Sequence, residues 1–277
     1  MKNFRITYPQ EKHSMNLLKG NLLMTASGYN IILLLGILTG SFLNVCIYRI
    51  PKGASVAFPP SHCTKCNHPL KIRDLIPMIS YMILQGKCRY CGETISLQYP
   101  LIEVLNGLFY VFLFKIFGFS FLFISYAILI SLLITVTWID FQHQVIPDEV
   151  IIFGFVFSLF FHLFHDAHFI FRNGILGFFI AGGVFLLIAL MSNGAMGGGD
   201  IKLMTMLGFW LGWKNITLII LLSFFIGAVV SIVLIITKIK RSKDYVPFAP
   251  FIALATVITV FWGKSIVNWY FHVFFSF

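Results

Sequence analysis

Residues 119–140 read FSFLFISYAILISLLITVTWID, a run whose one charged residue is the aspartate at its end. A stretch of about 20 apolar residues is long enough to cross the hydrocarbon core of a bilayer as one helix. Similar runs recur along nearly the whole chain after residue 22. We therefore expect an all-α polytopic membrane protein. A carboxylate at the end of such a span, here Asp140, is costly and marks a candidate functional site.

Composition agrees with this interpretation. The chain has 277 residues, of which 58% are hydrophobic and 11% charged, whereas a soluble domain carries about 25% charged residues. The sequence predicts eight transmembrane helices, the sixth of which is short for a span. Their expected ranges are 28–47, 101–117, 119–139, 146–165, 173–192, 201–213, 215–237 and 248–264.

A longer polar stretch separates the first two predicted helices and divides the chain into parts. The N-terminal arm is basic, like a signal peptide, but no small-x-small cleavage site follows it, so we expect an uncleaved first span. The expected parts are a basic arm at 1–27, a first helix at 28–47, a loop domain at 48–100, a membrane domain at 101–264 and an interfacial aromatic tail at 265–277.

The net charge is +10, but the basic residues gather in short loops beside apolar runs. This pattern sets membrane topology rather than nucleic-acid binding, and it predicts that loops 48–100 and 238–246 are cytoplasmic. The six predicted helices between these loops return the chain to the same side only if the short segment 201–213 crosses the membrane. Under that topology, Asp140 and Asp200 lie at one membrane face.

Two C-x-x-C pairs lie in the loop domain, with 21 residues between them. This spacing is typical of a structural zinc site with four thiolate ligands, and a metal would stabilise a loop too small to fold well alone. Iron in a rubredoxin-like site and four incidental cysteines are the alternatives, and His62 and His68 are alternative ligands. The fifth cysteine, Cys46, is expected to be a core thiol. The predicted metal ligands are Cys63, Cys66, Cys88 and Cys91.

Residues 194–204 read GAMGGGDIKLM and place three glycines before Asp200. Glycines allow a close approach of backbones, so Asp200 can meet a neighbouring helix. Two carboxylates held together cannot both ionise easily and can share one proton, as in aspartic proteases. The pair therefore suits hydrolysis, or alternatively proton or cation transport. Lys202 either marks the cytosolic edge or keeps Asp200 ionised. A P-loop is excluded, because no G-K-[ST] follows the glycines.

The remaining acidic residues favour structural interpretations. Glu103 and Asp148 lie near predicted helix starts, where a negative charge is favourable in a first turn or cap. Asp166 lies in a predicted external loop rich in histidines. Those histidines are candidate metal ligands, although an ordinary loop is the simpler interpretation: His162, His165 and His168.

Four sequence blocks in this order resemble the type IV prepilin peptidases, a family of polytopic aspartic proteases. The first block is GSFLNVCIYRIP at 40–51, and the second runs from CTKC at 63–66 through CRYCGETISLQYPLIE at 88–103. The third and fourth are DFQHQVIPDE at 140–149 and GAMGGGDIKL at 194–203. By this resemblance, Asp140 and Asp200 are the catalytic pair.

The resemblance also implies a substrate. Members of the family cleave the basic leader from prepilins or pseudopilins after a glycine, at the cytoplasmic face of the bacterial cytoplasmic membrane. Many also methylate the new N-terminal amine with S-adenosylmethionine, although no G-x-G-x-x-G motif on a strand–helix unit supports this activity here. Type IV pili, type II secretion and competence systems all use such substrates.

Two further function classes are compatible with a polytopic chain. An ion or small-solute transporter would be expected to show two matching broken helices, and the sequence has one glycine break without a partner. A non-enzymatic assembly factor of a pilus or secretion system would not need either aspartate. Both alternatives fit the residues less well than a peptidase.

Overall fold

A computed structural model describes residues 26–192, 196–241 and 244–275, so nearly all of the predicted arm at 1–27 lies outside the described residues. These residues form helices and short helical turns, together with two isolated β-bridges. The long helices are α2 (Ala26–Arg49), α4 (Gln98–Phe117), α5 (Phe121–His143), α6 (Asp148–His165), α8 (Ile175–Met191), α9 (Gly198–Ile236) and α10 (Ala249–Phe275). The short elements are η1 (Ile50–Lys52), η2 (Ile72–Asp74), α3 (Ile79–Ile83), α7 (Ala167–Phe169) and η3 (Ile170–Gly174).

Seven helices in the described ranges are long and apolar enough to cross a membrane. The predicted all-α polytopic architecture is therefore confirmed, including a small cysteine-containing region between the first two spans. The count differs from eight because the predicted segments 201–213 and 215–237 both fall in α9. Helix α9 has 39 residues. At about 1.5 Å per residue, a straight helix of that length would far exceed a bilayer core of about 30 Å.

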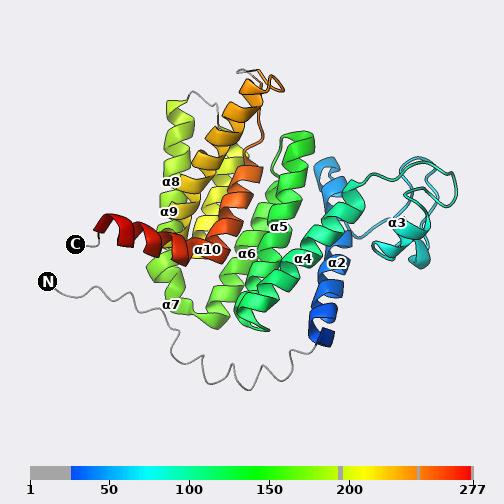
Figure 1. Cartoon of the computed structure of the whole chain (residues 1–277), viewed down its shortest axis with the longest axis horizontal. Coiled ribbons are helices and arrows are strands. Elements are labelled where there is room, and N and C mark those ends of the chain that lie inside the picture. The colour runs from blue at the N-terminus through cyan, green and yellow to red at the C-terminus, as the bar shows by residue number, and fades with distance from the viewer. Residues whose placement is uncertain (1–25, 193–195, 242–243, 276–277) are drawn as a thin grey trace.

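A break at Gly212 divides α9 into two shorter helical arms. Gly212 has φ 78° and ψ 167°, which is not helical, and only glycine adopts that region readily. A Cβ there would lie 2.9 Å from Phe169 of α7, and α7 lies at the end of the bundle opposite the start of α9. Because the residues after α9 return to the end that holds Asp200, the two arms of α9 run in opposite directions (Figure 1).

Adding a side chain at this break should destabilise the fold. The Gly212→Ala variant should lose about 1–3 kcal/mol of unfolding free energy, since it forces alanine into a region that glycine alone tolerates. Thermal unfolding in detergent measures the loss. The matched control is Gly183→Ala, where an added Cβ meets nothing within 4 Å. Equal unfolding midpoints for the two variants would contradict the role of the break.

Helix α5 is the most buried of the candidate spans and lies at the centre of the bundle (Figure 1). One face packs in a core shared with α2 and α4, and the other packs in a core shared with α6, α8, α9 and α10. Gly36 and Gly40 form a small-x-x-x-small stripe on α2, where an added Cβ would lie 2.7 and 2.8 Å from the α4 backbone. This close packing holds α2 and α4 together.

The chain places several helix ends at one end of the bundle. These are the last turns of α2 and α5 and the first turns of α4, α9 and α10 (Figure 1). The cysteine-containing region and the α9–α10 connection lie at this same end. The predicted tail at 265–277 continues α10 as helix up to Phe275.

Candidate functional site

Asp140 lies in the last turn of α5 and is only 2% exposed. The helix ends at His143 because Gln144 adopts a left-handed conformation (φ 55°), from which its N–H donates to the Asp140 carbonyl at 2.9 Å. Pro147 then precedes α6 and fixes the start of that helix. The apolar run of α5 therefore carries Asp140 to the end of the bundle and holds it inside.

Asp200 is the third residue of α9 and is 5% exposed. A negative charge is favoured in a first helical turn, where backbone N–H groups point outward. The Asp200 Oδ1 is buried and has no hydrogen-bond partner among the described residues. This carboxylate is thus held in place by its helix while one of its oxygens remains available.

The two aspartates are close enough to interact electrostatically. A third helix end joins them, because the Ala249 N–H at the start of α10 donates to Asp140 Oδ2 at 3.2 Å. The first N–H groups of a helix lack partners within the helix, which makes them suitable donors to an anion. Pro247 and Pro250 flank Ala249 and suit a helix start.

A tyrosine from the α9–α10 connection also faces this pair. Burial raises the pKa of the Tyr245 hydroxyl, and the charges of Asp140 and Asp200 raise it further. Neither Tyr245 nor Ala249 is among the predicted site residues. A backbone N–H has no residue signature, and the nearest signal in the sequence is the proline pair around Ala249.

The close approach expected of the glycine run occurs at Gly199. A Cβ there would lie 2.8 Å from the Cβ of Ile146, in the turn before α6. At Gly198 it would meet nothing within 4 Å, and none of Gly197, Gly198 and Gly199 has a positive φ. The glycine run therefore allows α9 to pack closely on the α5–α6 turn. It is not required for an unusual backbone conformation.

Lys202 pairs with Asp148 rather than with Asp200. Its Nζ lies 2.7 and 2.9 Å from the two carboxylate oxygens of Asp148, which is in the first turn of α6 as expected. Both side chains are more than half exposed, and an exposed ion pair contributes about 0–1 kcal/mol. The pair links the starts of α6 and α9 at the edge of the bundle.

The four cysteines of the loop domain come together. Their sulfur atoms all lie within 4.8 Å of one another, and Cys63 Sγ is 3.9 Å from Cys91 Sγ. Thiolates at about 2.3 Å from one tetrahedral zinc ion lie about 3.8 Å apart, so the cluster fits such an ion. A hydrogen bond from the Cys66 backbone N–H lowers the pKa of the Cys63 thiol, whereas the neighbouring thiols raise the pKa of Cys91, so the cluster holds its protons unequally in the absence of a metal.

The two C-x-x-C pairs have the same local structure. In the first pair, the Asn67 N–H donates to the Cys63 carbonyl at 2.9 Å. In the second, the Gly92 N–H donates to the Cys88 carbonyl, also at 2.9 Å. Asn67 and Gly92 both have a positive φ, at 56° and 73°. Each pair is thus an independent knuckle, and the cluster is built from two equivalent halves.

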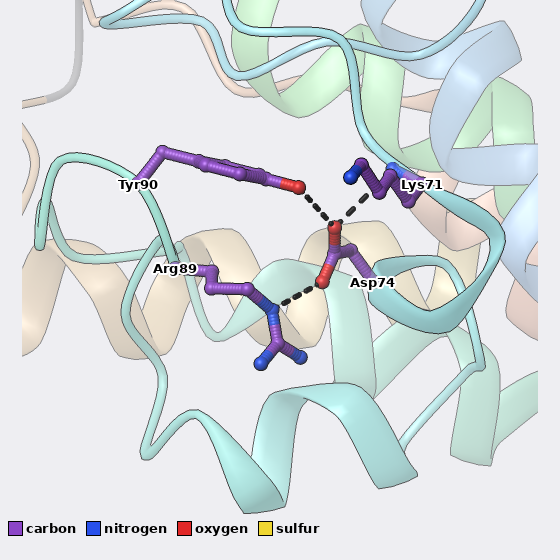
Figure 2. A network of polar contacts seen from close by, with 4 residues as sticks. All are labelled: Lys71, Asp74, Arg89 and Tyr90. Carbon is purple, nitrogen blue, oxygen red and sulfur yellow. Dashed lines mark hydrogen bonds and ion pairs between the residues drawn. The ribbon is translucent and has the colours of Figure 1, made fainter.

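A buried carboxylate joins the knuckles (Figure 2). Asp74 accepts hydrogen bonds from the Arg89 Nε at 2.6 Å, the Tyr90 hydroxyl at 3.1 Å and the Lys71 backbone N–H at 3.2 Å. Burial would raise the pKa of the Asp74 carboxyl, but these donors lower it below its usual range. His68, from the first knuckle, stacks on Tyr90 with ring centroids 3.7 Å apart. These contacts orient the second knuckle against the first.

The structure corrects the interpretation of Glu103. It was expected in a helix cap or first turn, but α4 begins at Gln98, so Glu103 lies in the helix interior and is 6% exposed. Its Oε2 accepts the Met78 backbone N–H at 2.8 Å, from the loop domain. The burial depends on how this domain packs on α4, which the local sequence does not reveal.

The histidines near Asp166 take structural positions. His162 is buried on α6, with Nε2 3.0 Å from the Trp210 carbonyl, and His165 stacks on Phe161. In the described parts of the chain, the four cysteines are the one cluster suited to a metal. His62 and His68 are outside it, and Cys46 is buried as expected.

Comparisons with known proteins match two regions of the chain. The family description "Bacterial Peptidase A24 N-terminal domain" matches residues 34–117, and "Type IV leader peptidase family" matches residues 127–232. Together these two matches contain the cysteine cluster and both aspartates. No solved structure matches the chain.

Curated relatives match over most of their length. A protein of Stutzerimonas stutzeri is 34% identical over 86% of this chain and 92% of its own. One of Bacillus subtilis (strain 168) is 34% identical over 87% of this chain and 97% of its own. Both bear the name "Prepilin leader peptidase/N-methyltransferase". With the helical architecture and the two matched regions, these relatives show that the chain is a multi-pass membrane protein belonging to the type IV leader peptidase family.

Proposed function

We propose that the chain is a prepilin leader peptidase in which Asp140 and Asp200 form the catalytic pair. The observation that carries the proposal is a pair of buried carboxylates whose charges interact, with a helix N-terminus bonded to one of them. The name of the relatives supports prepilins as substrates. The transporter and assembly-factor hypotheses have no support in this family.

The pair suits peptide hydrolysis at a water molecule held between the carboxylates. One carboxylate takes a proton from the water as its oxygen attacks the scissile carbonyl, and the other donates a proton to the carbonyl oxygen. The C–N bond then breaks and the amine leaves with a proton. The Ala249 N–H holds one Asp140 oxygen in position, and the unpartnered Asp200 Oδ1 is available for water or substrate.

The position of the pair matches the shape of a prepilin. Such a substrate has a basic leader followed by an apolar helix, so its scissile bond lies at the membrane boundary. Basic residues of the α9–α10 connection lie at the same end as the aspartates (Figure 1). They include Lys238, Lys240 and Arg241. By the positive-inside rule, this end faces the cytoplasm of a bacterial cytoplasmic membrane.

The cysteine cluster is assigned to a structural zinc ion. Four thiolates complete a tetrahedral shell and leave no open position for a substrate, which argues for stabilisation of the loop domain rather than for catalysis. A methyltransferase activity with S-adenosylmethionine as donor is supported by the second half of the relatives' name.

The direct test uses the full chain in lipid nanodiscs with prepilins of type IV pilus, type II secretion and competence systems. Intact mass spectrometry should show loss of the basic leader after its glycine. Addition of S-adenosylmethionine should add one methyl group to the mature product only. Failure to cleave any of the three substrate classes would overturn the proposal.

A glycine substitution tests how closely the site must be held. The Gly199→Ala variant should cleave prepilin about 10- to 100-fold more slowly, because its Cβ would press on Ile146 and shift Asp200. The neighbouring Gly198→Ala change, made where there is free space, should cleave at nearly the unaltered rate. Initial rates at saturating substrate make the comparison, and equal rates for the two variants would rule out this packing role.

A further inference from the structure

A cavity of about 440 Å³ lies between the loop domain and the ends of α2 and α4. Pockets of about 300–1,000 Å³ hold small organic ligands, usually with apolar walls and a few well-placed polar groups. Three tyrosines contribute to the walls, and aromatic rings of this kind stack on purine bases. They are Tyr48, Tyr81 and Tyr99.

The cavity contains a buried acceptor without a partner. Asn44 is 2% exposed, and its Nδ2 donates to the carbonyls of Gly40 and Tyr99 at 3.3 and 3.1 Å. Its Oδ1 has no hydrogen-bond partner in the described ranges. A buried polar atom left unpaired costs about 1–3 kcal/mol, so this oxygen suits a donor group of a ligand.

Six charged side chains line the cavity: Arg49, Lys65, Asp74, Arg89, Glu93 and Glu103. Asp74 pairs with Arg89 at 2.6 Å, and Lys65 pairs with Glu93 at 3.7 Å. Arg49 is buried and donates to the carbonyls of Ser55 and Pro59. Arg49 and Glu103 make no ion pair among the residues that the structure describes, so Glu103 is the one lining carboxylate without a cation.

A buried carboxylate without a cation is costly, and a cationic ligand would remove that cost. Glu103 accepts one backbone N–H, from Met78 at 2.8 Å, and its carboxylate also interacts with the Ser41 hydroxyl, so it has polar partners but no cation. Asn44 and Glu103 both line this cavity, from α2 and α4. Two buried lining residues therefore offer acceptor oxygens, one of which carries a negative charge.

The cavity also reaches the last turn of α5, although neither Asp140 nor Asp200 lines it. Gln142, two residues after Asp140, lines it, and its Nε2 donates to Gln98 Oε1 at 2.6 Å. Hydrolysis at Asp140 would release an amine at the end of the bundle where the cavity lies. A reaction that transfers a group onto that amine would use both the cavity and the aspartate pair.

We propose that this cavity binds S-adenosylmethionine. Glu103 would face the sulfonium of the ligand, and Asn44 Oδ1 would accept a hydrogen bond from one of its N–H or O–H groups. This inference rests on the proposed function, because the donor has a use only if a new N-terminal amine is produced. When bound, the donor supplies a methyl group: the amine nitrogen bonds to the methyl carbon as the carbon–sulfur bond breaks, sulfur keeps the bonding electron pair, and the amine releases a proton.

Binding of two related ligands tests the proposal without measuring methyl transfer. S-adenosylmethionine carries the sulfonium charge, and S-adenosylhomocysteine has the same nucleoside without it. By equilibrium dialysis on the full chain in nanodiscs, Glu103→Gln should weaken S-adenosylmethionine about 10- to 100-fold and S-adenosylhomocysteine much less. Asn44→Ala should weaken both by a similar factor. The exposed Glu149→Gln change is the matched control and should alter neither.

Several results would overturn the proposal. One is no binding of either ligand to the unaltered chain at millimolar concentration. Another is an equal loss of both ligands in Glu103→Gln. A third is a loss in Glu103→Gln for a peptide with a free N-terminal amine but not for S-adenosylmethionine, which would assign the carboxylate to the amine. Unfolding midpoints without ligand show whether each variant folds.

A second measurement needs no variant. Ultraviolet cross-linking of labelled S-adenosylmethionine to the unaltered chain should label peptides that contain residues 41–49 or 96–103, and labelling confined to other peptides would overturn the assignment. Prepilin cleavage by the same preparation reports on the proposed function alone. Cleavage without ligand binding would overturn only the proposed donor site. Ligand binding without cleavage of any prepilin class would overturn the proposed peptidase function.

Discussion

The Asp200→Asn substitution should slow prepilin cleavage about 10²- to 10⁴-fold, and Asp140→Asn should do the same. Asparagine keeps the shape of the side chain but cannot exchange a proton as a carboxyl group does. The fold should tolerate both changes, since Asp200 Oδ1 has no partner to lose and an asparagine oxygen at 140 can still accept the Ala249 N–H. Single-turnover cleavage followed by intact mass measures the loss.

Two comparisons make this result specific to the pair. The double variant should be no slower than about the worse single variant, because groups that act as a unit are not additive. Asp166→Asn makes the same chemical change at an exposed position at the other end of the bundle and should cleave normally. Cleavage at the unaltered rate by either single variant would remove the aspartates from the mechanism.

The second large effect concerns the metal. Cys88→Ser should reduce zinc from one ion per chain to nearly none, because a hydroxyl is a poor replacement for a thiolate ligand. Structural zinc contributes about 10–16 kcal/mol in small zinc-finger peptides, so the loop domain should open when the ion is lost. Elemental analysis and trypsin cleavage in the loop domain measure the two effects. Exposed tryptic positions there include Lys65, Lys71 and Lys87.

The control for this variant is Cys46→Ser, which alters a buried thiol outside the cluster. It should keep the zinc ion and the protease resistance of the loop domain. Chelation of the unaltered chain should reproduce the Cys88→Ser pattern while cleavage of prepilin continues, since the aspartates lie on other helices. A metal other than zinc in protein purified without chelator would assign the cluster to that metal.

The spans and the four cysteines could be predicted because their signals lie in consecutive residues. An apolar run has a length, and a knuckle has a fixed spacing. Pairing of Asp140 with Asp200 could be argued from charge in the loops, which placed both at one face. The residues that were missed or misinterpreted contribute through contacts made by distant segments. The contacts of Asn44 and Glu103 form only where the loop domain and α4 pack together with α2.

The same reason explains the break at Gly212. Hydropathy separates segments 201–213 and 215–237, but nothing in their composition says that the chain reverses there. The reversal depends on the packing of Gly212 against Phe169 and Asn173, from another part of the chain. Local patterns therefore indicate where a helix runs, while its direction relative to other helices is a property of the assembled bundle.

The hydrogen bond from Ala249 has a consequence for the boundaries of the proposed catalytic unit. The matched family regions end at residue 232 and include both aspartates, yet the donor to Asp140 belongs to the helix that follows them. A chain shortened to those regions would keep the acidic pair and lose the group that orients it. Mutations that bend or shift α10 should thus act as active-site mutations, although they lie outside the segment by which the family is recognised.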